Sequence, residues 1–306
     1  MELGIQVVGP YDHVARVGAL CESAGIAAVA LADHYLYGST AAEWSAPAYD
    51  SLVQTAALAR DTSEIEIVML VSPITFRHPA VYAKTIATVD EIAGGRFVFG
   101  LGTGWHQGEH DIYGFDFPSL GDRFAMLDDA LGYLRAVIDA PEAGYAGNRW
   151  SLEGLDIQPR IRPDFRLLVG GGGASKTPDL VGRFAGEYNL YHHEADGIAE
   201  RLSVMRRAAI DAGRNPDEVL ITTCLPTIGG ADQAEIDAFI GEYGDARGLT
   251  SDEARAKLTD RITPMTWDQL ADRLAALEGF GFSRVYLQVI GGIAWSVENA
   301  LAALTN

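Results

Sequence analysis

Short apolar runs alternate with longer amphipathic segments along the whole chain, and this alternation constrains the fold more than any other feature. Eight runs rich in β-branched residues have the length of strands, at 3–8, 27–33, 65–71, 97–102, 166–171, 187–192, 219–227 and 283–290. Apolar residues spaced three and four apart indicate helices between them, at 12–24, 48–60, 79–93, 123–138, 199–212 and 266–277. The sequence therefore predicts an α/β fold in which strands and helices alternate.

Eight strand–helix units are the number in a (β/α)8 TIM barrel, and 306 residues leave room for insertions. The alternative is an open doubly wound sheet, which usually has a glycine-rich turn after its first strand. Here the first predicted strand leads directly into a helix. We therefore expect one barrel domain over 1–306, with an irregular insertion at 140–164 before the fifth strand and a polar helical insertion at 231–263 after the seventh.

The charge of the chain excludes some partners. There are 23 Lys and Arg residues against 42 Asp and Glu, a formal net charge of −19. Nucleic acids and anionic membranes are bound by clustered basic residues, so we expect neither as a partner. We see no apolar run of membrane-spanning length, no secretion signal and no paired cysteines, and we expect a cytoplasmic globular protein that acts on a small molecule.

The carboxyl ends of the strands carry the site in a barrel enzyme, so these positions identify candidate residues. Asp33 and His34 end the second predicted strand. A carboxylate beside a histidine can hold the ring in one tautomer and help it to transfer a proton near neutral pH. The alternative is a histidine that is merely hydrogen-bonded in a loop, and the position at a strand end favours a catalytic role.

Four consecutive glycines, Gly170 to Gly173, follow the fifth predicted strand and precede a helix that begins near Lys176. Glycines let backbone N–H groups approach an anion closely, and a helix N-terminus adds a favourable dipole. These residues therefore predict a phosphate site, with a flexible turn as the alternative. Small residues at 100–104 suit a flat ring that lies close to the backbone.

Two histidine pairs could suggest a metal. His106 and His110 are four residues apart, but Gly108 weakens the helix that would align them. His192 and His193 would point to opposite faces of a continuing strand. We therefore expect no metal site.

Several motifs together resemble the bacterial-luciferase-like flavin oxidoreductases, the luciferase-like monooxygenase superfamily. They are SPITFRHPAV at 72–81, DEI at 90–92, GGRF at 94–97, GLGTGW at 100–105 and GGGG at 170–173. The resemblance implies a (β/α)8 barrel that uses either FMN or the deazaflavin coenzyme F420. It also implies a homodimer and a flavin or F420 reductase as electron donor.

The Asp33-His34 pair looks more like the F420 branch of this family, in which the histidine lies beside C5 of the ring. The resemblance therefore implies hydride transfer between C5 and a small organic substrate, with His34 exchanging a proton and Asp33 orienting it. It implies that Trp44 and Trp105 line the substrate side. Trp105 replaces the typical glutamate of the branch, and Glu109 is the nearest carboxylate.

The same resemblance implies a set of cofactor-binding residues. They are Asp33, Leu70 and Val71 at a non-prolyl cis peptide behind the ring, Thr103 and Gly104 at its edge, and Gly170, Gly171, Gly172 and Lys176 near the phosphate. Arg77, His78 and Arg183 are further candidates for the anionic tail, and for Arg77 and His78 a structural contact is the alternative. The alternatives for function are an FMN-dependent two-component monooxygenase, a flavin- or F420-binding barrel without turnover and a metal-dependent hydrolase.

Overall fold

The computed structural model describes residues 1–36, 48–154, 157–191, 195–260, 262–289, 300 and 302–303. The barrel strands are β1 (Glu2–Val7), β2 (Ala28–Leu31), β3 (Glu66–Pro73), β4 (Phe97–Gly102), β7 (Leu167–Gly171), β8 (Glu187–Leu190), β9 (Leu220–Thr227) and β12 (Arg284–Val289). The helices are α1 (Tyr11–Ser23), α2 (Ser51–Asp61), α3 (Pro79–Ala93), α4 (Gln107–Tyr113), α5 (Leu120–Asp139), α6 (Lys176–Phe184), α7 (Ala195–Asp211), α8 (Gln233–Asp245), α9 (Ser251–Thr259) and α10 (Trp267–Gly279).

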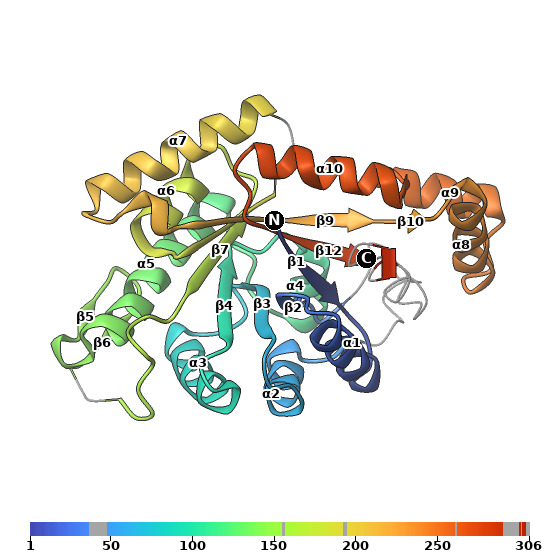
Figure 1. Ribbon diagram of the computed structural model, residues 1–306. Coiled ribbons are helices and arrows are strands. Elements are labelled where there is room, and N and C mark those ends of the chain that lie inside the picture. The colour runs from blue at the N-terminus through green and yellow to red at the C-terminus, as the bar shows by residue number, and fades with distance from the viewer. Residues whose placement is uncertain are drawn as a thin grey trace.

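The strands close into a parallel barrel in the order β1-β12-β9-β8-β7-β4-β3-β2, with helices packed around them (Figure 1). The predicted (β/α)8 fold is therefore confirmed, and the helix predicted at 79–93 has the bounds of α3. Strands β2 and β8 end two residues earlier than predicted, at Leu31 and Leu190. Asp33 and His34 therefore lie just beyond β2 and not within it.

Alternate residues of each strand belong to two different apolar clusters. Val29 and Leu31 of β2 pack into the large cluster between strands and helices, whereas Ala28 and Ala30 pack into a small cluster inside the barrel. This separation follows from the period of two in a strand. The ring of Tyr286 also lies in the inner cluster, so the barrel is filled with side chains.

Charged side chains close the end of the barrel at which the strands begin. Glu187 is fully buried there and accepts hydrogen bonds of 2.9 Å from the hydroxyls of Thr222 and Tyr286. Its second oxygen lies 3.2 Å from Nε of Arg166. Buried charges persist in proteins when they are paired and hydrogen-bonded, as this one is.

The same cluster continues across the barrel through a second arginine. The guanidinium of Arg284 lies 2.5 Å from a carboxylate oxygen of Glu2 and 2.6 Å from one of Glu66. Glu66 also pairs with Arg166 at 2.5 Å. These contacts join the starts of β1, β3, β7, β8 and β12 and leave the opposite end as the candidate site.

The two insertions are more ordered than the sequence suggested. The segment 140–164 was expected to be irregular, but it contains the hairpin β5 (Tyr145–Ala146) and β6 (Ser151–Leu152). The carboxylate of Asp129 fixes this hairpin because it accepts from the N–H groups of Asn148, Arg149 and Trp150.

Helices α8 and α9 project to one side of the barrel (Figure 1) and have an apolar core of their own, which includes Ile236, Phe239, Ile240 and Leu258. Two short parallel strands, β10 (Gly229–Gly230) and β11 (Met265–Thr266), pair where this extension begins and ends. The prediction of a helical insertion is confirmed, although its helices are amphipathic and not uniformly polar.

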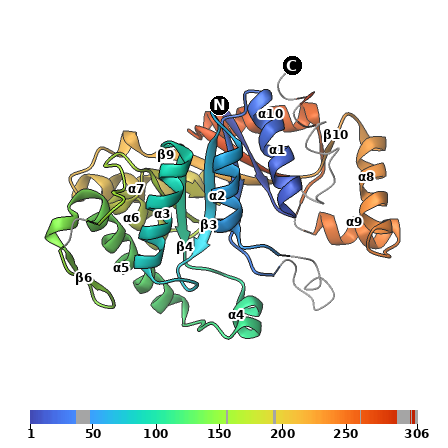
Figure 2. The ribbon, with the colours of Figure 1, turned by 90° about the horizontal axis from the view of Figure 1, so that it is seen from below.

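Helix α4 stands apart from α2 and α3 in Figure 2 and forms in spite of Gly108. The low helix propensity of Gly108 thus does not prevent this helix, in which Glu109 and His110 are buried. Among the described helices, none combines the length and apolarity that a bilayer crossing requires.

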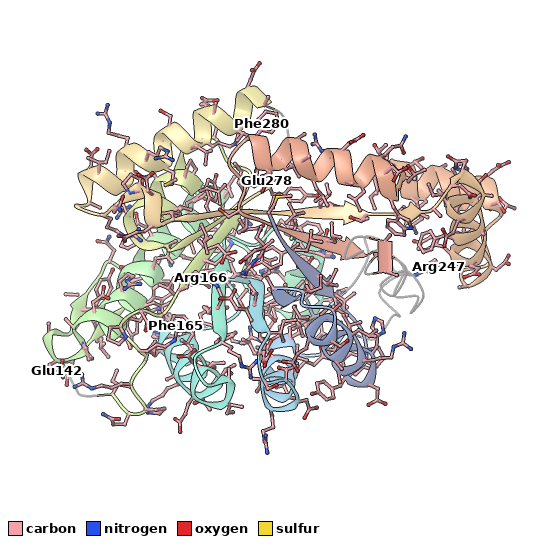
Figure 3. All side chains as sticks on the ribbon, in the orientation of Figure 1. Glu142, Phe165, Arg166, Arg247, Glu278 and Phe280 are labelled. Atoms are coloured by element: carbon pink, nitrogen blue, oxygen red, sulfur yellow. The ribbon has the colours of Figure 1, made fainter. Side chains whose placement is uncertain are left out.

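The charged cluster at the strand starts generates a stability prediction. Glu187→Ala should lower the free energy of unfolding by about 3–5 kcal/mol, because it removes one partner of a buried ion pair. Urea denaturation followed by circular dichroism measures this loss. The matched control is Glu142→Ala, which removes the exposed pair with Arg160 and should cost less than about 1 kcal/mol. Figure 3 labels Glu142 at the edge of the molecule and Arg166 beside the strands. Equal losses in the two variants would contradict the interpretation.

Candidate active site

Asp33 is buried just beyond β2 and holds neighbouring loops together. It accepts hydrogen bonds from the hydroxyl of Ser72 and from the guanidinium of Arg77. Arg77 also donates to Oη of Tyr35 at 2.6 Å and to Asp50 at 3.0 Å. Burial opposes the charge of Arg77, but the carboxylate of Asp33 raises the pKa of the guanidinium above its usual value. This network fixes the positions of the residues on either side of His34.

His34 is held by a carboxylate from a distant part of the chain. Its Nδ1 donates to Oε1 of Glu109 at 2.6 Å, and the N–H of Tyr35 donates to Oε2 at 2.6 Å. The Glu109 side chain is 1% exposed, whereas that of His34 is 21% exposed. Burial would raise the pKa of Glu109, but the hydrogen bond and charge of His34 and the bond from Tyr35 lower it below its ordinary value. Glu109 therefore accepts as a carboxylate, and the His34 hydrogen lies on Nδ1.

This geometry corrects the expected role of Asp33. The sequence predicts that Asp33 orients His34, but the carboxylate of Asp33 accepts hydrogen bonds from Ser72 and Arg77. Consecutive residues of an extended chain point in opposite directions, so Asp33 enters the interior while His34 faces the opening. Glu109, whose role the sequence left open, orients His34 instead.

Aromatic side chains surround the exposed side of His34. Trp105 lies edge-on to its ring with centroids 5.7 Å apart and is 68% exposed. Behind them, Tyr35 stacks on Phe76 at 4.8 Å. The structure thus places Trp105 beside His34, as the sequence predicts, whereas Trp44 lies outside the described residues.

The end of β3 lies at the barrel opening, and we call its residues Leu70 and Val71 the floor of this opening. The peptide bond between Leu70 and Val71 is cis, as the resemblance implies, and the pairing of β3 with β4 shifts register between Met69 and Ser72. The carbonyl of Leu70 accepts a 2.7 Å hydrogen bond from Nε2 of Gln6, which lies inside the barrel. Gln6 therefore fixes this floor from below.

Glycines of β4 and of β7, the strand beyond it, make room for the side chain of Val71. A Cβ atom would lie 2.8 Å from Val71 if added at Gly100, and 3.0 Å if added at Gly102 or at Gly170. Such contacts are too close for any other residue at Gly100 without a shift of its neighbours. The end of β3 therefore packs closely on the backbone of its neighbours through the small apolar side chain of Val71.

The glycine-rich turn after β7 lies at the same end of the barrel. Gly171 has a φ of 150°, a conformation that side chains rarely adopt, and residues 173–176 are exposed. Ser175 precedes α6 but makes no side-chain capping hydrogen bond to its first turn. Arg201 of α7 donates to the carbonyl of Gly172 at 2.9 Å, which brings a positive charge to this turn. The turn has the groups that an anion requires.

The cations expected near an anionic tail have different environments. Arg77 pairs with Asp33, Arg183 pairs with Asp128 and Asp179, and His78 accepts from the N–H of Ala80 as the cap of α3. These three therefore make structural contacts, which is the alternative left open for Arg77 and His78, and their role in binding a tail stays a prediction.

Lys176 is exposed at the start of α6, with its ammonium group 5.3 Å from the ring centre of Phe124. It lines a groove of about 480 Å³ between α5, α6 and α7. Lys176 is thus the member of the predicted tail set that stays available beside the glycine-rich turn.

Both ring nitrogens of His110 are engaged. Nδ1 donates to the carbonyl of His106 at 2.9 Å, and Nε2 lies 2.7 Å from the hydroxyl of Thr75. No cluster of three or more potential metal ligands occurs within the described part of the chain. His192 and His193 lie outside it.

Three positioning residues escaped the sequence analysis. Besides Gln6 and Arg201, Arg123 of α5 donates to the carbonyls of Thr103 and Gly104 and places its guanidinium 3.8 Å from the ring centre of Phe117. The polar character of position 6 inside an apolar strand is a signal that could have identified Gln6. Arg123 and Arg201 lie on amphipathic helices and have no distinguishing pattern.

Comparisons with known proteins agree with this architecture. The family profile described as luciferase-like monooxygenase matches residues 3–284. Among solved structures, an F420-dependent secondary alcohol dehydrogenase in complex with an F420-acetone adduct superposes with a TM-score of 0.80 over 99% of this chain and 97% of that chain, at 14% identity. At this identity the likeness shows the fold alone.

Curated relatives divide between two cofactors. An FMNH2-dependent dimethylsulfone monooxygenase of Pseudomonas fluorescens is 22% identical over 90% of this chain and 81% of its own length. An F420-dependent glucose-6-phosphate dehydrogenase of Amycolatopsis mediterranei is 27% identical, over 58% of this chain and 51% of its own length. The chain thus matches about half the length of this second relative.

The contact between Glu109 and His34 generates a prediction that needs no substrate. In Glu109→Gln the amide can donate as well as accept, so the neutral His34 ring should lose its fixed Nδ1–H tautomer. Nitrogen-15 NMR of the histidine rings measures the tautomer. His78 is an internal control, because its Nδ1 accepts from a backbone N–H and should keep its signal. An unchanged His34 tautomer would contradict the assigned role of Glu109.

The pH dependence of stability tests the same contact. Because the folded-state pKa of Glu109 lies below its ordinary value of 4.5, its stabilising contribution is complete above about pH 4.5 and is lost as the pH falls through the folded pKa. The difference in unfolding free energy between the protein and Glu109→Gln should therefore shrink in acid. Denaturant titrations between pH 3 and pH 7 measure it, and a difference that is constant with pH would count against the contact.

Proposed function

Because this chain belongs to the luciferase-like monooxygenase family, we propose that it is an oxidoreductase that transfers a hydride between C5 of coenzyme F420 and a small organic substrate. The observation that carries this proposal is the His34–Glu109 pair at the opening of the barrel. A histidine with one nitrogen held by a carboxylate can exchange a proton through the other at neutral pH.

His34 has the geometry of a proton donor or acceptor. With Nδ1 committed to Glu109, proton exchange with a substrate oxygen falls to Nε2. Glu109 holds the orientation of the ring. F420, when bound, supplies the carbon that accepts or donates the hydride. Trp105 lies beside His34 and would exclude water from the reacting groups.

The residues of this chain fit a planar cofactor with an anionic arm. The cis peptide between Leu70 and Val71 would lie behind the ring, held in place by the close packing of Val71 on Gly100 and Gly170. The N–H groups at 171–175 would hold the phosphate, with Lys176 and Arg201 as the nearby cations. Thr103 and Gly104, held by Arg123, would line the ring edge.

FMN is the second candidate cofactor on the same fold. The match to an FMNH2-dependent monooxygenase covers most of both chains, which favours it. Such a chain would receive reduced flavin from a separate reductase. The histidine beside the floor favours F420 in our proposal, since the resemblance to the F420 branch rests on that residue.

Titration of the protein with FMN and with oxidised and reduced F420 tests the proposal. We expect F420 to bind more tightly than FMN. Binding of each cofactor is measured by the change in its absorbance and fluorescence. Tighter binding of FMN would favour the FMN-dependent alternative. If neither FMN nor either form of F420 binds, the proposed function is wrong.

His34→Ala separates catalysis from binding. It should reduce F420 turnover on a panel of alcohols and aldehydes by roughly 10²- to 10⁴-fold while F420 affinity stays within a few fold. His78→Ala, which removes the cap of α3 and the ring contacts with Tyr133 and Trp150, is the control and should leave turnover near that of the unmodified protein. Cofactor binding without any turnover would support a binding protein instead.

A further inference from the structure

The residues 103–119 join β4 to α5 and contain α4, and we call them the α4 segment. This segment carries Glu109, which orients His34, and Trp105, which lies beside that histidine. Figure 2 shows α4 set apart from the barrel helices α2 and α3. A long connection keeps one conformation only where its ends and its interior are held. The contacts that hold the α4 segment therefore decide whether Glu109 meets His34.

Arg123, in the first turn of α5, holds both ends of the α4 segment. At the start of the segment its Nη1 donates to the carbonyls of Thr103 and Gly104. At the end of the segment its Nε donates to the carbonyl of Pro118 at 3.1 Å. A guanidinium is planar and carries its donors in a fixed fork, so one side chain can bridge carbonyls of separate parts of the chain. Arg123 thereby joins the two ends at one point.

The guanidinium of Arg123 is buried and is satisfied by carbonyls instead of a carboxylate. Arg123 is 8% exposed, and within the described ranges of the chain no carboxylate forms an ion pair with it. Burial lowers the pKa of this guanidinium below its usual range. A buried cation is costly unless its donors are satisfied, so Arg123 requires these carbonyls and the face of the Phe117 ring, 3.8 Å away. The side chain that joins the two ends is thus itself fixed.

Phe117 connects Arg123 with the interior of the α4 segment. The centre of its ring lies 3.8 Å from the guanidinium on one side and 4.5 Å from the ring centre of His110 on the other. Both ring nitrogens of His110 are hydrogen-bonded, so this ring has a fixed place. His110 directly follows Glu109 in α4. Packed side chains therefore lead from the joined ends of the segment to the residue beside the buried carboxylate.

We propose that Arg123 is a positioning residue of this site: by joining the two ends of the α4 segment, it keeps Glu109 hydrogen-bonded to Nδ1 of His34 and so leaves Nε2 of His34 for the substrate. Arg123 acts here through the backbone of the segment and through Glu109. This inference rests on the proposed function, because it takes His34 as the group that exchanges a proton with the substrate.

Nitrogen-15 NMR of the histidine rings tests the inference in the protein without cofactor, with the His34 signals assigned by His34→Gln. At a pH at which the ring is neutral, Arg123→Gln should convert a measurable fraction of His34 from the Nδ1–H to the Nε2–H tautomer. Arg123→Lys should do the same, because an ammonium group keeps the charge but lacks the planar fork. An unchanged tautomer in Arg123→Lys would overturn the bridging role.

Circular dichroism checks that each variant folds. Should Arg123→Gln fail to fold, Arg123→Lys, which keeps the buried charge, decides alone.

Arg214 provides a matched control at the other end of the barrel. It donates to the carbonyls of Val181, Gly182 and Ala185 at 3.2, 2.7 and 2.6 Å, near the start of β8. Burial lowers the pKa of this guanidinium as well. Arg214→Gln therefore removes contacts of the same kind and should leave the His34 tautomer unchanged. An equal change of the tautomer in Arg214→Gln and Arg123→Gln would show a general loss of stability and would contradict the assigned role.

Turnover separates this inference from the proposed function. With F420 and a panel of alcohols and aldehydes, Arg123→Lys should lower kcat by roughly 10- to 100-fold, because small displacements of a positioned group cost this much, while KM changes by a few fold at most. If the unmodified protein turns over and Arg123→Lys keeps its full kcat, the inference is wrong and the proposed function stands. If no flavin or deazaflavin binds to the unmodified protein, the proposed function fails, and the tautomer still decides whether Arg123 orients His34.

Discussion

Glu109 is buried at the barrel opening, and its two oxygens accept from the ring of His34 and from the N–H of Tyr35. Removing a carboxylate from water costs several kcal/mol unless it is paired and hydrogen-bonded, so this side chain requires both donors. In turn, the His34 ring and the N–H of Tyr35 must stay in place, because otherwise the buried charge of Glu109 would lose its hydrogen bonds. The loop after β2 and helix α4 are thereby joined, and the only histidine at the end of β2 takes a defined orientation.

The barrel could be predicted from the sequence because its signals are local. Strands of apolar β-branched residues and helices with regular apolar spacing appear in the chain itself, and the eight predicted strands correspond to the eight barrel strands. Position 34 could be identified for the same reason, since the carboxyl end of a strand is a place in the topology. The hairpin of β5 and β6 could not, because its stability comes from Asp129 on a different element.

The site was predicted less completely, since roles depend on contacts between distant residues. Asp33 and His34 are neighbours in sequence, which suggested a pair, but the backbone directs them apart and Arg77 takes the carboxylate. The small residues at 100–104 suggested a flat ring and Gly170 suggested a phosphate site, whereas the structure shows that Gly100 and Gly170 make room for Val71. That relation depends on the course of β3 at residues 69–72, which composition and spacing do not reveal.

The ion-pair cluster of Glu187, Arg166 and Arg284 has a consequence for the order in which ligands bind. The cluster closes one end of the barrel, so a ligand of the barrel can enter only through the opening at the other end. In the proposed arrangement, a cofactor at Val71 would lie deeper in the barrel than a substrate that contacts Trp105, which is largely exposed. Such a cofactor would bind before the substrate and leave after it.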